Sequence, residues 1–319
     1  MAFPSPSLAP PALSTYQLSY GGLVFGGVAP GSTYQLQGPL SIDMPDVASG
    51  DVQRALDQGE FKGLDVLPGA DITIVQAVTC GSPIGPAGVT EAQARALDAA
   101  VQDLGGVLGP GGVSEIPLWL QMASGTFCRL CRPRKHNCPL DINRVYAGVT
   151  IATTLLHSTD PRWYLAPSQQ SAAVGLPAAV GGGLAIPAAV PWSLGAGSAG
   201  GLITVVNSGK FESRPLLIIT GPCTNPVITN TSLPGSPWIG VTQALNAGDT
   251  LVIDTDWLSV VYTTAGSSAG SPRRNALMAG TTWWNLPANS SSVIEFSSAD
   301  TAPVSGTLTV QSASAYLSL

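Results

Sequence analysis

Glycine and proline recur along the whole chain and limit the length of any helix that it can form. The 319 residues include 37 glycines and 27 prolines, about one residue in five, where average usage is closer to one in eight. Both types are the poorest helix formers, so we expect a mainly β chain with frequent turns. Hydrophobic residues make up 45% of the chain and charged residues only 10%, which excludes wholesale disorder.

Short apolar or alternating runs between turn residues predict strands. In the first half these runs are 23–25, 34–36, 71–78, 115–122 and 149–157. In the second half they are 202–206, 216–220, 227–231, 251–254, 293–296 and 308–310. Turn signals every ten residues or so after Gly201 are typical of an antiparallel β-sandwich.

One helix is predicted, over residues 91–104. Thr90 is the expected N-cap, and Gln93 stands three residues later, as in a capping box. The apolar stripe consists of Leu97, Val101 and Leu104. We expect Gly105 and Gly106 to end the helix.

The chain length suggests two domains, and shifts in composition set their expected limits. Residues 1–17 are rich in Pro and Ser and indicate an N-terminal arm, followed by a first domain over 18–165. Residues 166–200 contain no charge and indicate a Gly/Ala/Pro connector. The predicted sandwich then occupies 201–319.

The net charge of −6 is unevenly distributed. Residues 1–115 carry a net charge of −8, residues 116–165 carry +4, and residues 166–319 carry −2. An acidic chain is a poor binder of nucleic acid, so we expect no sequence-specific nucleic-acid binding. The basic centre is a predicted loop that would contact a partner surface, and its bases are Arg129, Arg132, Arg134 and Lys135.

The same segment contains four residues of the types that bind zinc. Cys128, Cys131, His136 and Cys138 have the first spacings of a zinc knuckle. The single residue between His136 and Cys138 is too short an interval for that motif, so a metal-free loop is the favoured interpretation and zinc the alternative. Five cysteines, an odd number, argue against a disulfide framework.

No motif in the sequence predicts an enzyme, a bound cofactor or a membrane span. His157 has no nucleophile elbow elsewhere in the chain, and no Walker A, GxGxxG or HExxH pattern occurs. The charge-free stretch from Trp163 to Gly209 is interrupted by several prolines, which excludes an apolar helix long enough to cross a bilayer. The first 11 residues lack the basic and apolar regions of a secretory signal, so we expect no export through one.

Several stretches together resemble the distal tail (Dit-like) or minor tail proteins of long-tailed phages that infect actinobacteria. In the first half they are Leu23-Val24-Phe25-Gly26, Tyr34-Gln35-Leu36, Met44-Pro45-Asp46-Val47, Asp71-Ile72-Thr73-Ile74 and Asp160-Pro161-Arg162-Trp163-Tyr164. In the second half they are Pro215-Leu216-Leu217-Ile218-Ile219, Asn225-Pro226, Gly248-Asp249-Thr250-Leu251 and Trp283-Trp284. The Cys/His segment 128–138 departs from the family pattern, which leaves its role open.

The resemblance implies a structural protein of the virion. An N-terminal belt-like module would close a ring, usually of six subunits, and a galectin-like sandwich would decorate its outside. The ring would join the tail tube to the host-adhesion apparatus of the tail tip, or baseplate, of a siphovirus. Its partners would be further copies of the chain, the tail tube protein, other tail-tip proteins and a host-surface glycan, after synthesis in the host cytoplasm.

A carbohydrate-binding sandwich on a particle or cell surface is the alternative function. The aromatic residues that could stack on sugar rings are Trp238, Trp257, Trp283 and Trp284. A secreted hydrolase would need a paired nucleophile and base, and the sequence shows none.

Overall fold

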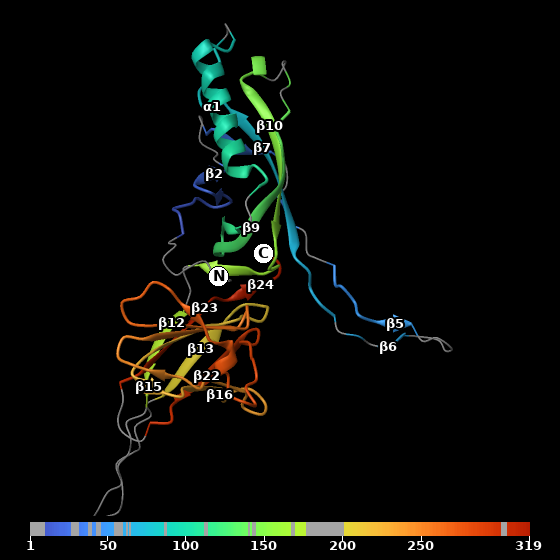
Figure 1. Cartoon of the computed structure of the whole chain (residues 1–319). Helices are drawn as coiled ribbons and strands as arrows, with labels where there is room; N and C mark the ends of the chain where they lie inside the picture. The colour runs from blue at the N-terminus through green and yellow to red at the C-terminus, as the bar shows by residue number, and fades with distance from the viewer. Residues whose placement is uncertain are drawn as a thin grey trace, which may run out of the picture. The chain divides into compact units, whose positions relative to one another are not determined.

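A computed structural model shows the fold of the chain (Figure 1). The residues that it describes are 10–26, 32–37, 40–42, 46–53, 60–61, 63, 65–85, 88–111, 114–139, 141, 145–166, 170–176, 201–300 and 305–319. Antiparallel strands are the main element, with 48% of the residues in strands and 9% in helices, which confirms the mainly β class. The chain divides into two compact units, Met1–Pro167 with Tyr316–Leu319, and Ser168–Ala315.

A sheet of ten described strands forms the first unit. Its main path has the order β2-β1-β8-β9-β10-β7-β3, and β4, β11 and β24 pair beside it. The strands are β1 (Leu18–Tyr20), β2 (Leu23–Phe25), β3 (Tyr34–Leu36), β4 (Ser41–Ile42), β7 (Ala70–Thr79), β8 (Ile116–Met122), β9 (Gly125–Asn137), β10 (Val149–Ser158), β11 (Trp163–Ala166) and β24 (Ala315–Tyr316). Strand β9 connects the two halves of this sheet, because its first half pairs with β8 and β11 and its second half with β10.

Strands β7 and β10 have one buried face and one partly exposed face. Ile72, Ile74 and Val78 on β7 are fully buried, as are Ala152 and Leu156 on β10. The residues between them are mostly intermediate in exposure. This alternation follows from the two-residue period of a strand, and it is the period that the sequence of 71–78 predicts.

Helix α1 (Glu91–Leu108) packs its apolar side into the core of the first unit. The capping box is confirmed: the Gln93 backbone N–H donates to Thr90 Oγ1 at 3.3 Å, and the Thr90 N–H donates to Gln93 Oε1 at 2.9 Å. The predicted end is wrong, because the helix continues through Gly105 and Gly106 to Leu108. Burial of Leu108, worth about 2 kcal/mol, together with the packing of Val107 against the core, offsets the cost of about 1 kcal/mol for each of the two helical glycines.

A two-stranded ribbon extends from the sheet of the first unit between β4 and β7 (Figure 1). Its strands are β5 (Val52–Gln53) and β6 (Glu60–Phe61), which pair with each other. Nearer the sheet, Ala48 and Val66 exchange two backbone hydrogen bonds of 2.9 and 3.0 Å. The ribbon is thus a continuous pair of antiparallel segments over its described length.

Two facing sheets with a shared apolar core form the second unit. One has the order β12-β23-β14-β19-β20-β21 and the other β13-β22-β16-β17. Their strands are β12 (Gln170–Gly175), β13 (Leu202–Asn207), β14 (Leu216–Thr220), β16 (Val227–Asn230), β17 (Trp238–Gly240), β19 (Thr250–Asp254), β20 (Ser259–Thr263), β21 (Ser271–Pro272), β22 (Ser290–Ser297) and β23 (Thr307–Ser312). A short pair, β15 (Cys223–Thr224) with β18 (Ala244–Leu245), and one 3-10 turn, Arg274–Ala276, complete the described elements.

The core of the second unit comes from alternate positions on both sheets. Leu217 and Ile219 on β14 and Leu251 on β19 are fully buried, as are Ile294 and Phe296 on β22. Inward-facing apolar residues from two antiparallel sheets are the defining pattern of a β-sandwich. The strands predicted in this half are all present, with small shifts at their ends.

Part of the expected connector is a strand. Residues 170–175 form β12, which pairs along its whole length with β23, whereas residues 167–169 and 177–200 lie outside the described residues. Residues 1–9 of the expected N-terminal arm also lie outside them. In the part of the chain that the structure describes, no helix combines the length and the apolar character needed to cross a membrane.

Candidate functional site

The four basic residues of the predicted loop lie on strand β9, so the loop prediction is wrong. Residues 125–131 pair with β8, residues 126–128 also pair with β11, and the segment from Arg132 onward pairs with β10. No strand among the described residues pairs with the other edge of the segment 132–137. Pro133 can be accommodated in this segment because a proline lacks only one ladder donor and an open edge does not need it.

A β-bulge turns two consecutive basic side chains toward solvent. Lys135 lies opposite Leu155, but Pro133 lies opposite Leu156, so Arg134 is an extra residue on β9. A bulge of this kind changes the direction of the side chains around it. Arg134 and Lys135 are both exposed as a result, and Arg132 is half-buried.

Arg129, in contrast to Arg134 and Lys135, is buried and only 1% exposed. Its guanidinium lies 4.9 Å from the centre of the Trp163 ring, a cation–π contact. Within the described residues none of its three nitrogens has a hydrogen-bond partner. Burial lowers the pKa of Arg129 from its usual value, and the nearby Cys131 and Asp160 oppose that shift. Arg129 therefore cannot contact a partner protein in the way that the sequence suggests.

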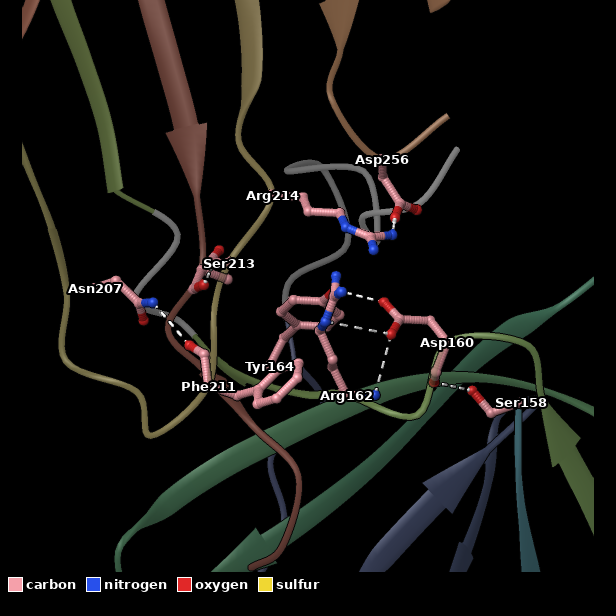
Figure 2. Close-up of polar contacts among 10 residues, drawn as sticks. Ser158, Asp160, Arg162, Tyr164, Asn207, Phe211, Ser213, Arg214 and Asp256 are labelled. Atoms are coloured by element: carbon pink, nitrogen blue, oxygen red, sulfur yellow. Dashed lines mark hydrogen bonds and ion pairs between the residues drawn. The ribbon is translucent and has the colours of Figure 1, made fainter. Parts of the chain in front are cut away.

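Asp160 organises the turn between β10 and β11. Its charge acts on the nearby Arg129, although the two side chains form no hydrogen bond. Its side chain accepts a hydrogen bond from the Tyr164 hydroxyl and one of 3.1 Å from the Arg162 backbone N–H (Figure 2). Its carbonyl accepts a 2.6 Å bond from Ser158 Oγ. Burial raises the pKa of Tyr164 well above its ordinary value. These contacts make the turn a structural element of the first unit.

The structure does not bring the four zinc candidates together. Cys128 and Cys131 are three residues apart on an extended strand, so their side chains point to opposite faces. His136 lies further along the same strand, where its Nδ1 is 3.0 Å from Thr154 Oγ1. Among the described residues no group of three or more His, Cys, Asp or Glu side chains could hold a metal ion. All five cysteines are free thiols.

His157 and Asp71 form a cross-strand pair where the ribbon joins the sheet. They lie directly opposite each other on β10 and β7, with His157 Nδ1 2.6 Å from Asp71 Oδ1. Gly69, the last residue before β7, approaches them closely: a Cβ there would lie 2.5 Å from the Ser158 carbonyl oxygen and 3.0 Å from the His157 ring. The pairing register could not be read from the sequence, so this contact was missed.

The ribbon is acidic, and its residues 46–51, 65 and 66 are exposed. We define the acidic ribbon as the described residues 46–53, 60–61, 63 and 65–66. Asp46, Asp51 and Asp65 are exposed. Asp51 Oδ1 accepts a 2.6 Å hydrogen bond from the Gly63 N–H, and this bond lowers the pKa of Asp51.

The four tryptophans of the second unit differ in exposure. Trp284 is 4% exposed and belongs to the core, and Trp283 packs against that core. Trp238 is half-buried against Gly240 and Gly280. Trp257 is 62% exposed, so it is the member of this set with a ring open to solvent.

Hydrogen bonds hold Trp257 on a defined turn after β19. Asp254 Oδ1 accepts backbone N–H bonds from Asp256 at 2.8 Å and from Trp257 at 3.1 Å. Asp256 in turn forms an ion pair with Arg214 (Figure 2). An exposed aromatic ring on an ordered turn can stack on a flat apolar partner.

Comparisons with known proteins give a match in structure and none in sequence. No family model matches the chain, and no curated protein matches it. The crystal structure of the Dit protein of phage SPP1, described as a paradigm of the hub adsorption apparatus in phages infecting Gram-positive bacteria, matches with a TM-score of 0.56 at 13% identity. The match covers 94% of this chain and 99% of that protein.

Two chains from baseplates of phage P2, in activated conformations with Ca and with Sr, are more distant. Each has a TM-score of 0.44 at 10% identity, covering 93% of this chain and 97% of that one. Their scores are too low to support a conclusion about fold. The SPP1 match by itself shows that the chain has the fold of a Dit protein, and it confirms the resemblance at the level of fold.

Proposed function

We propose that this chain is a structural protein of a phage tail tip, where its copies form a closed ring between the tail tube and the host-adhesion apparatus. The observation that carries the proposal is the match to the SPP1 Dit protein, which extends over both units and 94% of the chain. A match over a single sandwich would be weak support, because sandwiches occur in many unrelated proteins. A ring of six subunits is the copy number that the resemblance implies.

The surfaces of the first unit suit assembly better than catalysis. Arg134 and Lys135 are exposed and form no ion pair with a described residue, and residues 46–51, 65 and 66 of the acidic ribbon are exposed as well. Partly buried polar residues of the types that catalyse reactions are instead occupied in turns and strand pairs, as at Asp160 and at Asp71 with His157. The proposed role is therefore that of a non-enzymatic virion protein, synthesised in the host cytoplasm.

The proposed partners are further copies of the chain, the tail tube protein and other tail-tip proteins. Arg132, Arg134 and Lys135 would contact a partner or face the channel, without the buried Arg129. The second unit would be the galectin-like decoration on the outside of the ring. The low content of charged residues, 10%, reduces the desolvation cost of burying broad surfaces between subunits.

Measurement of size and location tests this proposal. We expect the purified full-length chain to form a ring-sized oligomer in native mass spectrometry and light scattering, with a central hole in negative-stain electron microscopy. Antibodies against the chain should label the tip of tails in intact particles. A chain that remains monomeric at high concentration and is missing from purified virions would contradict the proposal.

Glycan binding by the second unit is the alternative function, and the exposure of Trp257 favours it. A stacked indole contributes free energy mainly through its apolar face, so Trp257→Ala should abolish binding to host cell-wall saccharides in a glycan array. Trp284→Phe, a change inside the core, is a matched control that should leave such binding intact. Absence of any saccharide binding by the wild-type chain would rule out this alternative without affecting the ring.

A further inference from the structure

We propose that the acidic ribbon of one copy docks on the basic patch of the next copy, where the basic patch is Arg132, Arg134 and Lys135 at the end of β9. This inference rests on the proposed ring and names the two surfaces that would close it. The patch and the ribbon lie on different parts of one unit, and each lacks a partner of opposite charge within the described residues.

The described residues nearest the sheet at each end of the ribbon are not packed against the rest of the chain. Residues 46–51 are all exposed, including Val47 at 54%, and on the returning segment Val66 is 53% exposed. An isolated two-stranded ribbon is at best marginally stable in water. Burial against another protein would therefore stabilise the ribbon.

The ribbon nevertheless has a defined internal geometry. A Cβ on Gly63 would lie 2.0 Å from the Gly50 carbonyl oxygen, so the two segments lie side by side with almost no separation here. The Asp51 carboxylate fixes this close approach through its bond to the Gly63 N–H. A segment with such specific internal contacts, and with residues 46–51, 65 and 66 exposed, is organised for a contact outside its own unit.

Charge indicates what the ribbon contacts. The sequence from 46 to 66 contains five acidic and two basic residues, a net charge of −3. Asp46 and Asp65 are exposed and stand near the base of the ribbon. Arg134 and Lys135, directed outward by the bulge, are exposed charges of the opposite sign on the same unit. Complementary charged surfaces of this kind set the orientation and the rate of association.

The backbone of the patch supports the same contact. The segment 132–137 has one edge with no strand partner among the described residues. Basic side chains at an open edge discourage pairing with arbitrary strands, but an acidic segment neutralises them. The patch therefore selects an acidic extended segment, and the ribbon is one.

The contact is of the type that builds a ring. The ribbon and the patch are different surfaces, so their contact is heterologous and leaves one free ribbon and one free patch on every open chain of copies. Figure 1 shows the ribbon leading away from the sheet that carries β9. In a closed ring, which requires a fixed rotation between neighbours, every ribbon and every patch has a partner.

Charge reversal on each side tests the contact in the full-length protein. Arg134→Glu with Lys135→Glu, and separately Asp46→Lys with Asp65→Lys, should each weaken oligomer formation about 10- to 100-fold. Arg132 is left unchanged because its Nε is buried. All four changes together should restore assembly, and an equimolar mixture of the two double variants should form mixed rings, since each ribbon then meets a patch of opposite charge.

The matched control is Lys210→Glu with Arg274→Glu, which alters two exposed bases of the second unit by the same total charge and should leave assembly unchanged. Near-ultraviolet circular dichroism of each variant establishes that it is folded. Wild-type rings that persist unchanged in both double variants would overturn the contact but leave the proposed ring intact. Failure of the fourfold variant and of the mixture to assemble would also overturn it, and would indicate that an acidic segment of another tail protein occupies the patch.

Discussion

The two halves of β9 have similar residue types but differ in how deeply their side chains are buried. Each contains basic residues and a cysteine or a histidine, yet Arg129 and Cys131 are buried while Arg134 and Lys135 are exposed. The first half has β8 on one side and β11 on the other, so its side chains meet neighbours on both strands. The second half pairs with β10 alone among the described strands and contains the bulge. Position in the sheet, more than residue type, decides which charges are available to a partner.

Thiol reactivity should show the largest contrast. Burial raises the pKa of Cys131 to about 12, and Cys131 is fully buried, whereas Cys138 just beyond the strand is half-exposed. At pH 8 iodoacetamide should therefore label Cys138 at least about a thousandfold faster than Cys131, which becomes reactive only on unfolding. Peptide mass spectrometry over a time course measures both rates.

A Cys138→Ala variant is the control, because it should lose the rapid phase and keep the slow one. Equal labelling of the two thiols in the folded protein would contradict the assignment of the first half of β9 to the core.

Reversing an arginine should be costly in the first half of β9 and harmless in the second. Arg129→Glu places a carboxylate without a cation in the core near Asp160, and we expect it to lower the free energy of unfolding by about 3–5 kcal/mol. Arg134→Glu should change it by no more than about 0.5 kcal/mol. Urea unfolding followed by tryptophan fluorescence gives both values.

Arg129→Met separates charge from packing, since it keeps the aliphatic stem beside Trp163. Its stability should lie much closer to that of the wild-type chain than to that of Arg129→Glu. If Arg129→Glu and Arg134→Glu are equally stable, the comparison between the two halves fails.

The smallest expected effect is the contribution of His136, in the second half of β9, to the pH dependence of stability. Burial lowers the pKa of His136 below its usual 6.5, so the unfolded chain binds a proton at a higher pH than the folded chain does. Stability should therefore decrease as the pH falls through about 6.5, and this decrease should be complete once the pH is below the folded-state pKa.

His136→Gln should remove this part of the pH dependence while retaining a hydrogen-bonding group near Thr154. Thermal unfolding at intervals between pH 8 and pH 5, for both proteins, measures the difference. A steeper dependence in the variant than in the wild-type chain would contradict the direction of the shift.

Local sequence patterns predicted many elements well. The strand 71–78 has a two-residue period with one apolar side, and the structure places that side in the core. Thr90 and Gln93 predicted the start of α1, because a capping box acts within a few residues. Its end was missed, because burial of Leu108 depends on a sheet that is distant in the sequence.

The candidate site was predicted less well. Four bases, a proline and several thiol or imidazole groups favoured a metal-free loop, with a zinc-binding loop as the alternative, whereas the structure shows a strand. Nothing local in Arg129 distinguishes it from Arg134; only the position of Trp163 does so. The comparison at 13% identity shows the same limit on a larger scale, since the Dit fold is preserved where sequence similarity is too weak to match a family model.

The amino-acid sequence by itself determined the mainly β class, the positions of most strands and the excess of basic residues near its centre, because alternation, turn residues and charge act over short distances. Only the tertiary structure decided which of those basic residues are exposed, which histidine meets which carboxylate, and that an acidic ribbon stands apart from the core. These outcomes depend on which strands lie side by side and in what register, and residues far apart in the sequence set both.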